Sequence, residues 1–206
     1  MKKKYKILLT ILIILIIIIV AAIIVFKVFQ GSSTAEPVKV VDSIDNFDYT
    51  LDDRDTELMK KTYNELKDIL TASDIDYEKY AQALAKLFVI DLFTMDNKVN
   101  RYDVGSTEYV YPDSVENFKT NVEDTIYKTM ENNSNGKRKQ KLPEVSAIDE
   151  SNVETSTFTI GEDEYESYIV KLSWSYEKDL GYDKNATITL IPLNEKLYVV
   201  EYVTGE

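Results

Sequence analysis

The chain has 206 residues, a formal charge of −12, no cysteine and no histidine. Without cysteine there is no disulfide, no thiol nucleophile and no acylated lipoprotein cysteine, and without histidine the commonest zinc ligand and the base of a Ser/His/Asp triad are missing. Residues 31–206 hold 19 positive and 36 negative side chains, a formal charge of −17, which repels phosphate backbones, so nucleic acid is not an expected partner.

The N-terminal segment predicts a membrane anchor. Residues 7–26 read ILLTILIILIIIIVAAIIVF, with Thr10 as the only polar side chain. At about 1.5 Å per residue this run is about 30 Å long, the thickness of a bilayer's hydrocarbon core. A cleaved signal peptide has a shorter apolar region. We therefore expect a transmembrane helix over residues 7–29, and whether the chain after Ala35 is ever released by cleavage stays open.

The lysines around this run predict its orientation. Four of them precede it (Lys2, Lys3, Lys4 and Lys6), and Lys27 closes it. By the positive-inside rule, residues 1–6 form a cytoplasmic tail and the remainder of the protein lies outside the cell membrane. Residues 30–54, rich in Ser, Thr and Asp with no sustained period, predict a linker. Residues 55–206 are then the extracytoplasmic domain.

Helical periodicity covers the first half of this domain. Apolar residues recur at intervals of three and four over residues 55–70, 75–95 and 114–130, which predicts three helices. The second helix ends in LFVIDLF, where Asp91 alone is polar, so it is expected to be central and buried. Between the second and third helices, residues 109–111 predict a short strand.

After residue 136 the period changes from 3.6 to 2. Alternating apolar side chains predict strands over residues 155–160, 168–176, 186–190 and 197–203, joined by short hairpin turns. Helices followed by an antiparallel meander define the α+β class. The predicted architecture is therefore an N-terminal transmembrane helix followed by a roll of about three helices packed on a curved antiparallel sheet of about four strands.

This element order resembles the nuclear transport factor 2-like (cystatin-like) roll. The resemblance rests on that order, on the aromatic end of the second helix, LFVIDLF, and on the paired strands NATITLIPL and KLYVVEYV. Such a domain behind one membrane helix is similar to the bitopic subunit of conjugative type IV secretion systems. The resemblance implies an assembly subunit of a membrane machine, whereas the fold by itself hosts many functions.

Two acidic groups and one serine–lysine pair are candidates for metal binding or catalysis. Residues 52–55 (DDRD) and 162–164 (EDE) lack the alternating carboxylates and glycine of a calcium loop, which favours a helix start and a solvated turn. Residues 175–178 (SYEK) match the Ser-x-x-Lys spacing of penicillin-recognising enzymes, but the partner motifs are missing. No catalytic, metal or cofactor site is expected.

Two features indicate surfaces or cavities instead. The basic loop Lys137, Arg138, Lys139 and Lys141 is an isolated positive cluster that an anionic wall polymer, lipid headgroups or an acidic partner would recognise, or a solvated loop. The fifteen tyrosines and seven phenylalanines are many for this length, and most are expected between helices and sheet. The aromatic residues expected to line a cavity there are Tyr80, Phe88, Phe93, Trp174 and Tyr176.

These patterns favour a non-catalytic, membrane-anchored interaction module, a scaffold or assembly subunit of a cell-envelope machine. Its expected partners are the membrane and other envelope proteins, including further copies of the chain. The alternative is a small-ligand-binding or sensory domain that uses the cavity of the roll.

Overall fold

The computed structural model describes Ile19 and residues 38–205. The predicted tail, the transmembrane helix and the first part of the linker therefore lie outside the described residues, Ile19 excepted. None of the helices described is long and apolar enough to cross a membrane. Residues 38–205 form one compact unit by contact between their elements.

Three α-helices form the first layer of this unit. They are α2 (Glu57–Leu70), α3 (Tyr77–Phe93) and α4 (Val115–Asp124). Side-chain caps fix two of their starts, because the Thr56 hydroxyl accepts the Met59 N–H and the Asp76 carboxylate accepts the Lys79 N–H. The third helix, predicted to continue to residue 130, ends at Asp124, and turns follow it.

The second layer is a four-stranded antiparallel sheet. Its strands are β3 (Val145–Ile160), β4 (Asp163–Tyr176), β5 (Asn185–Leu193) and β6 (Lys196–Thr204), in the order β3-β4-β5-β6. The prediction of an α+β domain with three helices and a four-stranded antiparallel sheet is confirmed. The strand predicted over residues 109–111 is replaced by two 3₁₀ turns, Thr107–Tyr109 and Pro112–Ser114, between which Val110 forms one parallel bridge to Val199.

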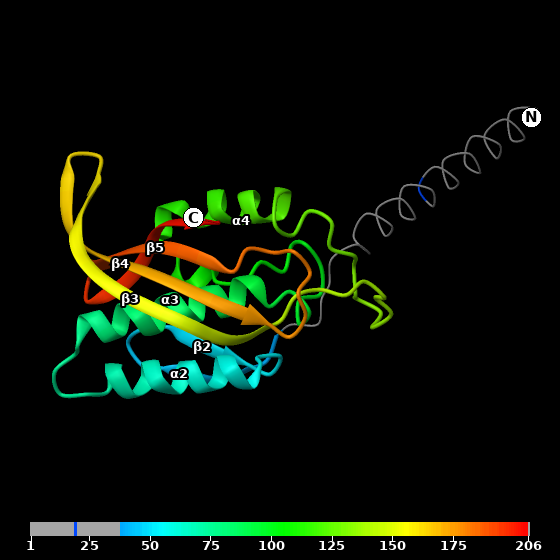
Figure 1. Ribbon diagram of the computed structural model, residues 1–206, viewed down its shortest axis with the longest axis horizontal. Helices are drawn as coiled ribbons and strands as arrows, with labels where there is room; N and C mark the ends of the chain where they lie inside the picture. The colour runs from blue at the N-terminus through cyan, green and yellow to red at the C-terminus, as the bar shows by residue number, and fades with distance from the viewer. Residues whose placement is uncertain (1–18, 20–37, 206) are drawn as a thin grey trace, which may run out of the picture. The chain divides into compact units, whose positions relative to one another are not determined.

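The core lies between α3 and the sheet. Along β4 the residues Val170, Leu172 and Trp174 are buried while Lys171 is exposed, so alternate side chains face the helix layer. Figure 1 shows α3 running behind β3 and β4 with α2 beside it. Eleven of the seventeen residues of α3 are buried, which confirms the expected central position of this helix.

The linker predicted over residues 30–54 ends sooner than expected. Strands β1 (Val40–Ile44) and β2 (Tyr49–Asp52) form an antiparallel hairpin with a separate two-stranded ladder. Ile44, Tyr49 and Leu51 are buried in the same core as the helices. Residues 40–52 therefore belong to the folded domain.

The hairpin of β3 and β4 extends beyond the other two strands. Strand β5 pairs with β4 only as far as Tyr168, whereas β3 and β4 stay paired up to the turn at Gly161 and Glu162. We call residues 155–167 the acidic arm, since they include Glu162, Asp163, Glu164 and Glu166 and no lysine or arginine. At about 3.3 Å per residue the arm reaches about 20 Å past the sheet, and it stands clear of the domain in Figure 1.

Candidate functional site

The five aromatic residues expected to line a cavity lie in the packed interior or at its margin. Tyr80, Phe88, Phe93 and Trp174 are each at most 2% exposed, and the ring centroids of Phe93 and Trp174 are 5.0 Å apart. Tyr176 is partly buried at the end of β4, and its hydroxyl donates to the carbonyl of Asp183 at 2.6 Å. These rings fill the space between α3 and the sheet, so they serve as core residues of the domain.

Two buried tyrosines form a closed hydrogen-bond ring with one residue of β6. The Tyr49 hydroxyl donates to the Leu197 carbonyl at 2.9 Å, and the Leu197 N–H donates to the Tyr80 oxygen at 3.0 Å. The two hydroxyl oxygens are 2.6 Å apart, so Tyr80 must be the donor to Tyr49. Burial raises the pKa of both phenols well above its ordinary value. The ring thus joins β2, α3 and β6, and the phenols stay protonated.

The basic loop is divided between anchors and exposed side chains. The Arg138 side chain is 3% exposed, and its guanidinium donates to the carbonyls of Lys98 at 2.8 Å and Asp96 at 2.6 Å. Gln140 accepts from the Glu131 N–H at 2.7 Å and donates to the Thr129 carbonyl at 3.0 Å. Arg138, predicted as a partner-binding residue, therefore holds the loop in place instead.

The three lysines of this loop are exposed. Lys137, Lys139 and Lys141 alternate with the two anchoring residues, so they share the outer side of the segment. None of the three forms an ion pair with any residue between 38 and 205. We call Lys137, Lys139 and Lys141 the basic row. A segment held by the buried Arg138 side chain and by the hydrogen bonds of Gln140 presents its charges at low entropic cost.

A charged pocket of about 240 Å³ lies where the β1–β2 hairpin, α2, α3 and the loop of residues 98–109 meet. Its carboxylates are Asp52, Asp55, Asp91, Asp103 and Glu108. Asp91 forms an ion pair with Lys98, whose side chain is 6% exposed, and Arg54 donates to Asp103 at 2.6 Å. Sequence reasoning missed this pocket. The available signal was Asp91 within LFVIDLF, because a carboxylate on a buried helix face needs a cation beside it.

Three acids of this pocket, Asp55, Asp103 and Glu108, have pKa values that their surroundings shift. Burial is the largest cause that raises the pKa of Asp55 to about 6, although the Asp52 N–H donates to it at 2.7 Å. Burial also raises the pKa of Glu108, which accepts from the N–H and the hydroxyl of Thr50. The Arg54 guanidinium helps to hold the pKa of Asp103 below its usual range. Among residues 38–205 no group of acids is arranged to hold a metal ion.

The loop beside this pocket packs closely against α3 at Gly105 and Ser106. A Cβ atom on Gly105 would lie 2.6 Å from the backbone oxygen of Asp91. The Ser106 N–H donates to the Asp91 carboxylate, and the Ser106 hydroxyl donates to the carbonyl of Phe88 at 2.7 Å. Because the Ser106 hydroxyl is already hydrogen-bonded, it is not an activated nucleophile. The ion pairs Asp91–Lys98 and Arg54–Asp103 support the fold.

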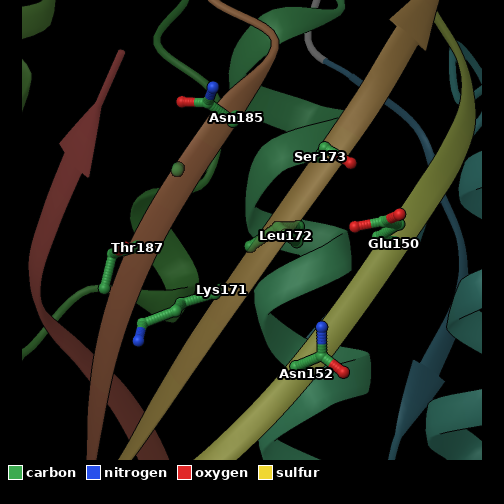
Figure 2. A pocket seen from close by; sticks show the side chains of 8 residues that line it. Glu150, Asn152, Lys171, Leu172, Ser173, Asn185 and Thr187 are labelled. Atoms are coloured by element: carbon green, nitrogen blue, oxygen red, sulfur yellow. The ribbon is translucent and has the colours of Figure 1, made fainter. Parts of the chain in front are cut away.

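A shallow polar hollow of about 300 Å³ lies on the face of the sheet opposite α3 (Figure 2). Two cross-strand rows line it, one from Glu150, Ser173 and Asn185 and the other from Asn152, Lys171 and Thr187. Lys171 also lies 3.6 Å from Glu154. The hollow offers one carboxylate, one ammonium group and small polar side chains, without an aromatic ring for stacking.

Comparison with known proteins identifies no relative, so the function has to be inferred from the surfaces of the domain itself. No model of a protein family matches the chain, and neither curated proteins nor solved structures give a match.

Proposed function

We propose that the chain is a non-catalytic interaction module, anchored in the cell membrane by residues 7–29 and facing outward. In this role it is a scaffold or assembly subunit of a cell-envelope machine such as a conjugation or type IV secretion apparatus. We also propose that residues 55–206 adopt a roll of the nuclear transport factor 2-like kind. The observation that carries it is the basic row, which is fixed from beneath by Arg138 and Gln140.

The filled interior also supports this proposal over the alternative. A ligand-binding or sensory roll needs an open space between helices and sheet. In this domain Tyr80, Phe88, Phe93 and Trp174 occupy that region with almost no exposed surface. In the charged pocket Lys98 and Arg54 are already paired with Asp91 and Asp103, which disfavours an anionic ligand there.

The test reverses the charges of the basic row while keeping its anchors. Lys137, Lys139 and Lys141 are changed together to glutamate, with Arg138 and Gln140 left in place, in the full chain. We expect an unchanged melting temperature and a loss of partner proteins recovered from crosslinked membranes. A partner set that is unaffected by this reversal would contradict the proposal.

The matched control places the same change in net charge elsewhere. Lys61, Lys79 and Lys119 lie on α2, α3 and α4, and their side chains reach solvent. Changing these three to glutamate should leave recovery unaltered, because the effect depends on position and not on total charge.

A further inference from the structure

The acidic arm and the basic row are complementary surfaces at opposite ends of one strand. The basic row ends at Lys141, β3 begins at Val145, and the arm occupies the far end of the β3–β4 hairpin. A sixteen-residue strand spans about 50 Å. The row and the tip of the arm of a single copy are therefore too far apart to neutralise each other.

Both surfaces are unpaired within the domain. Glu162, Asp163, Glu164 and Glu166 form no ion pair among residues 38–205, and neither do the lysines of the row. The sequence from residue 142 to residue 170 holds eight carboxylates and no lysine or arginine. The arm therefore has no paired cation among residues 38–205, so a cationic surface that binds it belongs to another molecule.

The backbone of the arm is equally open. β3 is an edge strand of the sheet, and over residues 155–160 it pairs with β4 alone. A two-stranded hairpin is marginally stable by itself in water, so contact along its free edge stabilises it.

From this arrangement we propose that the acidic arm of one copy docks on the basic row of a second copy. The contact is heterologous, because two different surfaces meet, so repetition produces a head-to-tail series of copies. Glu164 and Glu166 share one face of β4, and in this contact they meet the ammonium groups of the row. The inference rests on the proposed function, since it names a second copy as the partner of the basic row.

The absence of cysteine from the chain makes this contact testable by site-specific crosslinking. Asn135→Cys marks the basic loop and Thr159→Cys marks the arm, and both positions are exposed and leave every charge in place. Full chains carrying one or the other cysteine, with different tags, are co-expressed, and their isolated membranes are treated with a short bismaleimide. We expect the 135–159 product in excess over the 135–135 and 159–159 products.

Charge reversal identifies the cause of this crosslink. Changing Lys137, Lys139 and Lys141 to glutamate in the Asn135→Cys chain should abolish the 135–159 product. Changing the four arm acids to lysine in the Thr159→Cys chain should abolish it as well. Combining the two altered chains should restore it, because the charges are then exchanged between the surfaces.

The remaining outcomes separate this inference from the proposed function. Two results would overturn docking between copies. One is the formation of all three products in equal amounts, and the other is a 135–159 product that persists when either surface alone is reversed. If the reversed row loses other membrane proteins while no 135–159 product forms in the unaltered pair, the proposed function stands and the inference fails. The Lys61, Lys79 and Lys119 reversals serve as the control and should preserve the 135–159 product.

Discussion

The carboxyl group of Asp55 is a titrating group whose burial opposes its charged form. Its pKa rises from an ordinary value of 3.8 to about 6, and burial is the largest cause, with Asp52 and Asp91 adding repulsion and Lys98 opposing it. The folded state therefore binds this proton more tightly than the unfolded state does. Stability from this group is fully present below about pH 4 and is lost as the pH rises through about 6.

The size of this effect follows from the shift. A rise of about two pKa units corresponds to about 3 kcal/mol, and since the side chain remains partly exposed, solvent screening reduces this to roughly 1.5 kcal/mol. Asp55→Asn mimics the protonated group and keeps an oxygen that accepts the Asp52 N–H. It should therefore stabilise the domain by about 1.5 kcal/mol at pH 7 to 8 and by almost nothing at pH 4.

The assay is urea unfolding of the wild type and of Asp55→Asn at pH values from 4 to 8, with the free-energy difference plotted against pH. Taking the difference removes contributions common to both proteins, including that of Asp103, whose lowered pKa acts in the opposite direction. Asp53→Asn is the matched control because that side chain is exposed, and its difference should stay within about 0.5 kcal/mol. A flat difference curve for Asp55→Asn, or destabilisation at pH 8, would refute the reasoning.

Four further predictions concern the core, the turns and the topology. Phe88→Ala should destabilise the domain by about 3 to 5 kcal/mol in urea unfolding, and a loss below about 1 kcal/mol would contradict a central α3. Tyr80→Phe breaks the hydrogen-bond ring and leaves a buried N–H unpaired, which should lower the free energy of unfolding by about 1 to 3 kcal/mol. An unchanged free energy of unfolding would show that the ring does not stabilise the domain. Gly105→Ala should cost about 1 to 3 kcal/mol by overpacking against Asp91, and an unchanged denaturation midpoint would show that the loop yields. A cysteine at Ser134 should react with an impermeant thiol reagent on intact, wall-permeable cells, whereas labelling only after lysis would reverse the predicted orientation.

Regular periodicity explains which parts of the fold were predictable. The spacing of Met59, Tyr63 and Leu66 in α2, and the alternation around Trp174 in β4, arise because one side of each element is buried. The end of α4 depends on tertiary contact instead. Tyr127 donates its hydroxyl to the Leu92 carbonyl at 2.7 Å, which draws the chain away from a helical path that its apolar residues would otherwise continue.

Irregular pairing explains the strands that were missed. The register of β3 shifts between Val145 and Ala147 and again between Ile148 and Glu150, so its first part shows no alternation in the sequence. The β1–β2 hairpin has short strands, a register shift and mostly exposed residues in β1. Its buried Tyr49 reaches partners 31 and 148 positions away, and local patterns contain no information on such contacts.

For the candidate sites, the sequence shows which residue types are present but does not show how they are arranged in space. The basic loop is evident in the sequence, but the opposite roles of Arg138 and its lysine neighbours depend on carbonyl groups about 40 residues earlier in the chain. The charged pocket assembles acids from residue 52 to residue 108. Their proximity arises from the packing of four separate elements, which no spacing along the chain reveals.

The most direct test of the central claim compares three surfaces in one experiment. Proteins crosslinked to the chain in membranes are recovered from the wild type, from the reversed basic row, from Asp55→Asn in the charged pocket, and from Lys171→Glu in the polar hollow. We predict that partner recovery is lost for the reversed row alone. Undiminished recovery for the reversed row, together with loss for Asp55→Asn or Lys171→Glu, would contradict the claim and assign function to the pocket or to the open face of the sheet.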